Sequence, residues 1–213
     1  MLLPLFMAQF SDNHRAGSEA KPLRCAVLIS GSGTGMQALL NYQKSKSACT
    51  HQTNLVVCNN PEAGGIKIAE NFEIPVKILP LPKIEDKIQR RLNHERQLSK
   101  YLEEYDIELI ILSGYMRLLS EEFVEKWNMK ILNIHPSLLP NFPGAHAHRD
   151  VLSSGVKISG CSVHYVDAGM DTGQIIAQRK VPVFSDDTIE TLSQRVKIEE
   201  HILYPQVIDL LSS

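Results

Sequence analysis

The stretch KILNIHPSLLPNFPG, residues 130–144, decides the fold of this chain. Its apolar start predicts a buried strand, and Pro136 favours extended backbone angles at His135, the residue before it. Side chains two residues apart on a strand project from the same face, so Asn133 and His135 should point together. Because the chain then enters a proline-rich loop, we expect an amide and an imidazole at a strand end, where loops often carry chemistry.

Apolar runs alternate with helical spacing on the amino-terminal side of that stretch. The predicted strands are residues 23–30, 53–58, 75–79, 107–112 and 130–134. Helical spacing begins near Met36 and recurs at residues 61–72, 83–105 and 121–126. Such alternation predicts an α/β fold with a mostly parallel, twisted sheet and helices on both faces.

The pattern changes after Gly144. A helix is predicted at residues 145–153, followed by strands at 160–166 and 174–183 and a final helix at 186–211. Only a turn-rich loop separates the two strands, which predicts antiparallel strands at the C-terminal end.

Composition bounds the number of domains and the kinds of partner. The chain has 213 residues, is 43% hydrophobic and carries a net charge of −2. These values fit a single domain at residues 23–213 after a flexible extension at residues 1–22, and they give no reason to expect nucleic acid or a membrane as partner. The four cysteines form no CxxC pair. We therefore expect reduced thiols in a cytoplasmic protein.

A glycine-rich loop, GSGTG at residues 31–35, joins the first predicted strand to the first helix. Backbone N–H groups at such a helix start form an anion site, although the loop could also be a tight turn that only packs the helix. The spacing is not the dinucleotide GxGxxG, the second strand ends at Asn59 rather than at an acid, and no GK[ST] follows. One phosphate group, with Thr34 as an extra hydroxyl donor, is the ligand we expect.

The amide and imidazole need a third group that orients the ring. Asp171, between Gly169 and Gly173, is the best candidate because flanking glycines let the loop bend inward, and Asp167 is its competitor. An amide donates to an oxyanion, a histidine moves a proton near neutral pH, and a carboxylate beside the ring favours the imidazolium.

A metal site is not expected. His146, His148 and His164 invite that interpretation, but the first two stand two residues apart. They lack the i, i+4 spacing of a helical zinc pair, and no cysteine or acid stands at ligand spacing.

The segments NIHPSLLPNFPG, SGYMRLLS and GCSVHYVDAGMDTGQII together resemble the phosphoribosylglycinamide formyltransferase family. The resemblance covers about residues 24–211 and rests above all on NIHPSLLP. It implies a Rossmann-like formyltransferase fold and transfer of a formyl group from the co-substrate 10-formyltetrahydrofolate to the amine of glycinamide ribonucleotide, in purine biosynthesis. That substrate carries one phosphate monoester, in agreement with the glycine loop. It implies small-molecule partners only, and we expect a monomer or weak homodimer.

The same resemblance assigns residues to three roles. The implied catalytic residues are Asn133, His135 and Asp171. The residues implied for the ribonucleotide are Gly33, Thr34, Gly35, Arg91, Lys197, Ile198, Glu199 and Glu200. The residues implied for the folate are Met116, Arg117, Leu118, Leu119, Asn133, Asp167, Ala168, Gly169, Met170 and Asp171.

The phosphate loop departs from the family pattern. Family members commonly show Ser-Asn after the second loop glycine, where this chain has Thr34-Gly35. Thr34 keeps a hydroxyl, whereas Gly35 lacks an amide side chain. Because the backbone donors should remain, we expect altered phosphate affinity rather than loss of function.

Other activities fit part of the pattern. A formyltetrahydrofolate hydrolase would share the three catalytic residues and pass the formyl group to water, but the phosphate loop and Pro136 favour transfer. A methionyl-tRNA formyltransferase is disfavoured because there is no added domain for tRNA and no basic excess, and a nicotinamide dehydrogenase is disfavoured by Asn59. A catalytically silent nucleotide-binding module would not need the three candidate catalytic residues.

Overall fold

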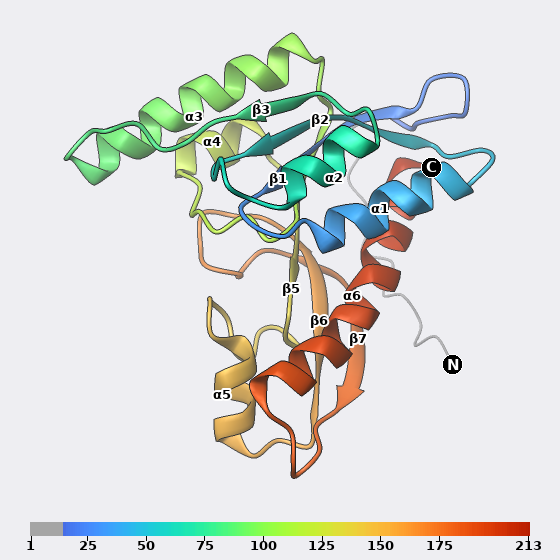
Figure 1. Ribbon diagram of the computed structural model, residues 1–213, viewed down its shortest axis with the longest axis vertical. Coiled ribbons are helices and arrows are strands. Elements are labelled where there is room, and N and C mark those ends of the chain that lie inside the picture. The colour runs from blue at the N-terminus through green and yellow to red at the C-terminus, as the bar shows by residue number, and fades with distance from the viewer. Residues whose placement is uncertain (1–14) are drawn as a thin grey trace.

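The computed structural model describes residues 15–213, and within that range seven strands form one sheet (Figure 1). The strands are β1 Leu23–Ile29, β2 His51–Cys58, β3 Val76–Ile78, β4 Leu109–Leu112, β5 Ile131–His135, β6 Ile158–Tyr165 and β7 Ile175–Pro182. Their order is β3-β2-β1-β4-β5-β6-β7. The strands from β1 to β5 pair in parallel, and β6 and β7 are antiparallel. The predicted α/β class and its antiparallel end are confirmed.

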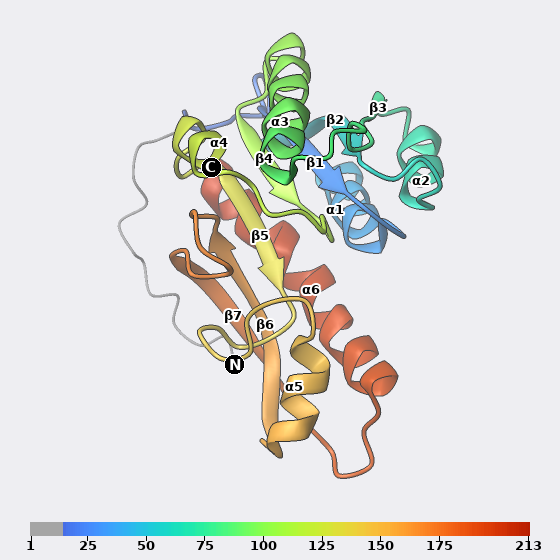
Figure 2. The same ribbon diagram turned by 90° about the vertical axis from the view of Figure 1, so that its left-hand side faces the viewer.

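Helices cover both faces of the sheet (Figures 1 and 2). They are α1 Thr34–Ser45, α2 Gly65–Asn71, α3 Lys87–Glu104, α4 Glu121–Lys126, α5 Ala147–Ser154 and α6 Ile189–Ser212. On one face, α3 and α4 bury Leu98, Leu102 and Phe123 against the central strands. On the other face, α1, α2, α5 and α6 share a core with β1, β6 and β7. No helix of residues 15–213 is both long and apolar enough to cross a membrane.

The central strands are apolar because both of their faces are covered. In β4 all four residues are buried, and in β1 only Arg24 is not fully buried. Such unbroken apolar runs are typical of parallel strands between two helical layers. The outer strand β7 instead alternates between buried and exposed side chains.

The order of the strands places a crevice at the carboxyl edge of the sheet. β1 lies between β2 and β4, so the chain leaves β1 toward one side and leaves β4 toward the other. Loops that diverge in this way open a binding site beyond the strand ends. Residues 31–35 and 113–119 are those loops in this protein.

The helices α2 and α3 each start four residues later than the sequence predicts. α2 begins at Gly65 because the chain first turns, with the Ala63 N–H donating to the Asn60 carbonyl. α3 begins after Asp86, whose carboxylate accepts from the Gln89 N–H at 2.8 Å. This side-chain cap satisfies a free amide of the first turn and fixes the start of the helix.

Part of the predicted extension lies against the domain. The Arg15 guanidinium pairs with the Glu108 carboxylate at 2.6 Å, and the Gly17 N–H donates to the Ser212 carbonyl at 2.7 Å. Residues 15–22 are therefore tied to Glu108, directly before β4, and to the end of α6. Residues 1–14 of the predicted flexible extension fall outside the described residues.

Candidate active site

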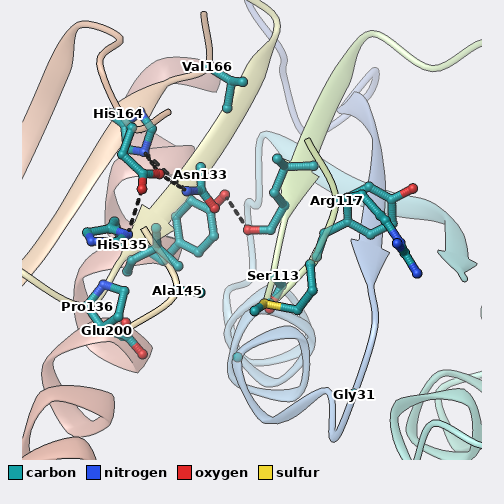
Figure 3. Close-up of a pocket in the computed structure, with 18 of the residues that line it drawn as sticks. Gly31, Ser113, Arg117, Asn133, His135, Pro136, Ala145, His164, Val166 and Glu200 are labelled. Carbon is teal, nitrogen blue, oxygen red and sulfur yellow. Dashed lines mark hydrogen bonds and ion pairs between the residues drawn. The ribbon is translucent and has the colours of Figure 1, made fainter. Parts of the chain in front are cut away.

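A cavity of about 550 Å³ opens at the carboxyl edge of the sheet. Its walls are the glycine loop after β1, the segment after β4, the end of β5, the loop after β6 and one face of α6. Figure 3 shows Asn133, His135 and His164 close together on one side of the view and Ser113 and Arg117 on the other. The cavity therefore joins the two regions for which the sequence predicted chemistry and phosphate binding.

His135 is the last residue of β5, as predicted, and its ring is only 5% exposed. Its Nδ1 lies 3.3 Å from Asp171 Oδ2, and its Nε2 lies 2.9 Å from the carbonyl oxygen of Phe142. Both ring nitrogens thus face oxygens that only accept hydrogen bonds. An imidazolium is the form that can donate to both.

Asn133 projects from the same face of β5, as predicted. Its Nδ2 lies 3.1 Å from His164 Nε2 and 3.5 Å from Asp171 Oδ1. His164 Nδ1 faces the carbonyl oxygen of Tyr165 at 2.8 Å, so a neutral His164 has its Nε2 lone pair free to accept from the Asn133 amide. The second amide N–H makes only the long contact with Asp171, which is at the limit of a hydrogen bond. This N–H is therefore available to a ligand.

Asp171 lies between the two histidines of the site and contacts both of them. Its Oδ2 accepts from the Gly144 N–H at 2.8 Å, and its backbone has φ 56°, in the left-handed region that aspartate tolerates better than most residues. Burial raises the pKa of the carboxyl, whereas the His164 ring, the Gly144 N–H and the charge of His135 lower it, and the net direction is downward. The carboxylate is therefore held in its charged form beside the imidazole.

The glycine loop presents unused backbone donors to the cavity. Gly33 is the N-cap of α1 with φ 73°, no side chain caps the helix, and its first turn holds no acidic residue. A Cβ at Gly33 would stand 2.6 Å from the Cα of Gly65, so only glycine fits between the two backbones. The free N–H groups of the first turn form an anion site.

The predicted folate segment follows β4 and forms another wall of the cavity. Met116 and Leu118 are 64% and 57% exposed, whereas Leu119 is buried. The segment is held in place because the Met116 N–H donates to the Ser30 hydroxyl and Tyr115 bonds His94 of α3, both at 2.9 Å. Exposed apolar side chains on a fixed loop are suited to one face of a flat ligand.

The predicted α6 residues divide between two environments. Lys197 and Glu200 line the cavity. Burial raises the pKa of the Glu200 carboxyl to about 7, although the charge of Lys197 opposes the shift. Glu199 instead pairs with Arg179 of β7 at 2.8 Å, and Ile198 is exposed.

Four predicted residues are not among the described residues that line the cavity: Arg91, Ala168, Ile198 and Glu199. Arg91 is exposed on α3, two turns before the buried Leu98. Ala168 borders a neighbouring hollow behind the loop that carries Asp171. All the other predicted site residues line the cavity.

Residues 15–213 contain one group of candidate metal ligands, Cys49, His51 and Asp209, at the amino end of β2. It lies at the sheet edge opposite the cavity. The Gln43 amide donates to His51 Nδ1 at 2.8 Å, because its oxygen accepts from the Thr53 hydroxyl at 3.0 Å. A neutral His51 then carries its proton on Nε2, which lies 3.8 Å from Asp209 Oδ1, too far for a hydrogen bond. The Nδ1 lone pair, which a metal would need, already accepts the hydrogen bond from Gln43.

Sequence reasoning missed the place of His164, which it considered only as a metal ligand. β6 pairs with β5 so that Asn133 stands opposite His164. Since both residues precede a turn-rich loop, pairing the two predicted strands in register would have found this neighbour. The Gly144 N–H, a backbone group, gives no signal in the sequence.

Comparison with known proteins agrees with this geometry. The sequence model of the Formyl transferase family matches residues 23–208. A phosphoribosylglycinamide formyltransferase of Bacillus subtilis is 41% identical over 186 residues, covering 87% of this chain and 93% of that protein. The trifunctional purine biosynthetic protein adenosine-3 of Bos taurus is 43% identical over 92% of this chain, which spans only 19% of that relative's length.

Solved structures give the same result. The crystal structure of glycinamide ribonucleotide transformylase 1 from Symbiobacterium toebii matches with a TM-score of 0.84 and 38% identity, covering 90% of this chain and 88% of that one. The phosphoribosylglycinamide formyltransferase from Brucella melitensis matches with a TM-score of 0.83 over 91% of this chain and 97% of that one. The chain described here therefore belongs to the formyl transferase family.

Proposed function

We propose that this protein transfers the formyl group of 10-formyltetrahydrofolate to the amine of glycinamide ribonucleotide. The observation that carries the proposal is the contact network of Asn133, His135 and Asp171 beside an uncapped helix start in one cavity. The first three groups can serve acyl transfer, and the helix start can bind one phosphate. The printed names of the relatives favour the same reaction.

The phosphate of the ribonucleotide is proposed to bind at the start of α1. Gly33, Thr34 and Gly35 offer backbone N–H groups there, and Thr34 adds a hydroxyl. Lys197 supplies a positive charge from the facing helix, and the Glu200 carboxyl can bond ribose hydroxyls. Arg91 would have to reach the phosphate from outside the cavity wall, with Ile198 and Glu199 supporting α6 rather than touching the substrate.

The folate is proposed to lie between the segment after β4 and the loop before β7. Met116, Leu118 and Leu119 offer apolar surface, and Arg117 lies beside them. Across the cavity, Asp167, Gly169 and Met170 belong to the loop that positions Asp171, and Ala168 supports it from behind. Such an arrangement would bring the formyl group to the end of β5.

The reaction begins when the substrate amine attacks the formyl carbon and its oxygen becomes an oxyanion. The free N–H of Asn133 can donate to that oxygen, because its contact with Asp171 is long and easily replaced. The other N–H stays on His164 and keeps the amide in position.

His135 supplies the mobile proton. Its Nε2 proton points at the Phe142 carbonyl in the free protein, but a charged oxyanion is a stronger acceptor than a neutral carbonyl. The Ser137 hydroxyl, which donates to the Asn141 carbonyl at 2.6 Å, also lies 3.1 Å from the Phe142 carbonyl and can turn to it when the imidazole turns away. The imidazolium can then give its Nε2 proton to the leaving folate nitrogen, and the neutral imidazole takes a proton from the attacking nitrogen, which restores the imidazolium.

Asp171 holds the imidazole in its orientation, because its Oδ2 lies 3.3 Å from Nδ1. No metal has a part in this scheme, since the amide and imidazolium supply the charge stabilisation. We expect the protein to work in the cytoplasm, where its four free cysteines remain reduced, as a monomer or weak homodimer acting on small molecules.

Formyltetrahydrofolate hydrolysis is the alternative function, because the same three residues could activate water. The uncapped helix start favours transfer, since a hydrolase has no phosphorylated acceptor to bind.

A two-substrate assay tests the proposal. Loss of 10-formyltetrahydrofolate is followed with and without glycinamide ribonucleotide, and formate is measured in parallel. We expect rapid loss only with the ribonucleotide and no release of formate. Equal loss without the ribonucleotide, with formate as product, would replace the transferase by the hydrolase.

A further inference from the structure

Gly35 and Ser113 lie side by side in the cavity wall, at the start of α1. Gly35 is the second residue of α1, and Ser113 follows the last residue of β4. A Cβ built on Gly35 would stand 2.8 Å from Ser113 Oγ, closer than real Cβ contacts come. A side chain at position 35 would therefore require the serine hydroxyl to turn away from its present position.

The hydroxyl also lies within reach of a ligand that the Gly35 N–H would bind. A Cβ is about 2.5 Å from its own amide nitrogen. Ser113 Oγ is thus at most about 5.3 Å from the Gly35 nitrogen. Two donors at this separation can share one oxygen that lies about 2.9 Å from each of them.

Nothing else among the described residues competes for this hydroxyl. The nearby Ser30 hydroxyl already accepts the Met116 N–H, whereas Ser113 Oγ has no hydrogen-bond partner within residues 15–213. Ser113 lines the cavity and is 9% exposed, so its hydroxyl can donate to a ligand bound there. A hydroxyl kept this way is ready to donate to a charged oxygen.

We propose that Ser113 is a binding residue for the phosphate group of the substrate, donating to a phosphate oxygen shared with the Gly35 N–H. The proposal rests on the proposed function, because it takes the ribonucleotide as the ligand. It also explains Gly35: glycine at this position leaves room for the donor that Ser113 supplies from the neighbouring strand.

The test is Ser113→Ala, with steady-state kinetics for both substrates and calorimetric binding of ribose 5-phosphate as a probe of the phosphate site. We expect about a tenfold rise in the KM for the ribonucleotide and in the Kd for ribose 5-phosphate, as for loss of one hydrogen bond to a charged group. The KM for 10-formyltetrahydrofolate should stay within about twofold, since the hydroxyl faces the start of α1.

Ser159→Ala is the matched control. It also removes a buried serine hydroxyl without a partner, but from β6 and away from the cavity. It should leave both KM values and the Kd for ribose 5-phosphate unchanged. If Ser113→Ala behaves like this control, the proposed contact does not exist.

A second pair of variants tests the steric relation through thermal stability. Gly35→Ala should give a lower melting temperature relative to its parent in the wild-type background than in the Ser113→Ala background, because the added methyl group meets Ser113 Oγ only in the first. The higher helix propensity of alanine acts equally in both backgrounds and cancels in this comparison. Equal changes in both backgrounds would show that Ser113 does not require glycine at position 35, and would overturn that part of the proposal.

The outcomes separate this inference from the proposed function. A wild-type protein that consumes formylfolate without the ribonucleotide and does not bind ribose 5-phosphate would overturn both. If the wild type is a transferase and Ser113→Ala binds ribose 5-phosphate with the same Kd as the wild type, this inference alone is overturned. A rise in the KM for formylfolate equal to that for the ribonucleotide would also contradict a contact confined to the phosphate.

Discussion

Two buried histidine–aspartate pairs lie at opposite edges of the same sheet. His135 ends β5 and faces Asp171, whereas His51 begins β2 and faces Asp209. The two histidines are almost equally buried, at 5% and 1% exposure. Only the first pair opens onto the cavity.

The hydrogen bonds of the two pairs differ. Both nitrogens of His135 face acceptors, and within residues 15–213 Asp171 pairs with histidines and with no lysine or arginine. Asp209 is instead paired with Lys46, and the Gln43 amide donates to the ring of His51. Burial lowers the pKa of His51 to about 4; the charge of Asp209 opposes this shift and that of Lys46 adds to it.

The difference shows that a histidine and an aspartate do not make a reactive site by themselves. In the His51 pair, Lys46 neutralises the Asp209 carboxylate and the Gln43 amide hydrogen-bonds the ring, so the pair has a structural role. In the His135 pair, the Asp171 carboxylate contacts the ring and the ring borders the cavity, so the pair can move a proton. The two pairs therefore serve as matched test cases within one molecule.

The largest expected effect comes from replacing each histidine by a residue of similar shape. His135→Asn should lower kcat about 10³-fold, because it removes the proton donor. His51→Asn should leave kcat within about threefold, since His51 is far from the cavity. The measurement is kcat with both substrates saturating. Comparable losses in the two variants would mean that the loss of activity reflects general damage to the fold.

The sequence predicted one of these pairs and not the other, for physical reasons. Asn133 and His135 are two residues apart on a strand and precede a proline, so local rules suffice to place them. Asp171 was inferred from flanking glycines, and its contact with His135 confirms the juxtaposition. The roles of His164 and of His51 depend on which strands pair and in what register, and no local pattern encodes that.

Asn133→Ala should have the next largest effect. Loss of one donor to an oxyanion costs about 3–4 kcal/mol of barrier, so kcat should fall roughly 10²- to 10³-fold while the folate KM changes little. Asn54→Ala is a suitable control, because it removes an asparagine amide from β2, away from the cavity. A kcat of Asn133→Ala near that of the wild type would remove the amide from the mechanism.

The free energy of unfolding should depend on pH with opposite signs for His51, at one edge of the sheet, and Glu200, in the cavity at the other. His51 has a folded pKa of about 4, below its ordinary 6.5, so the unfolded chain binds the proton more readily and stability falls as pH drops from 6.5 to 4. Glu200 has a folded pKa of about 7, above its ordinary 4.5, so stability falls as pH rises from 4.5 to 7. Each contribution is about 3 kcal/mol at full extent, from a shift of about 2.5 pKa units in each case.

Urea unfolding at several pH values between 4.5 and 7.5 measures these slopes. Relative to the wild type, His51→Gln should lose the decline toward acid, and Glu200→Gln should lose the decline toward neutral pH. If both variants keep the wild-type slope, neither group has a pKa that differs between the folded and unfolded states.

Arg91 should show the smallest effect. It is exposed and does not line the cavity of the free protein, so Arg91→Ala should raise the KM for the ribonucleotide about tenfold or less and change kcat less. Arg96→Ala, an exposed arginine on the same helix, is the control. An effect on the folate KM alone would contradict a role for Arg91 in phosphate binding.

The most direct test of the account is the rate of formyl transfer in a single turnover, with enzyme in excess over bound 10-formyltetrahydrofolate. Asp171→Asn and Asp209→Asn make the same chemical change at the two edges of the sheet. We predict that the first slows transfer at least about 10²-fold and that the second leaves it within about twofold. Equal rates for the two variants, at equal folded fraction, would contradict the claim that Asp171 makes His135 catalytic.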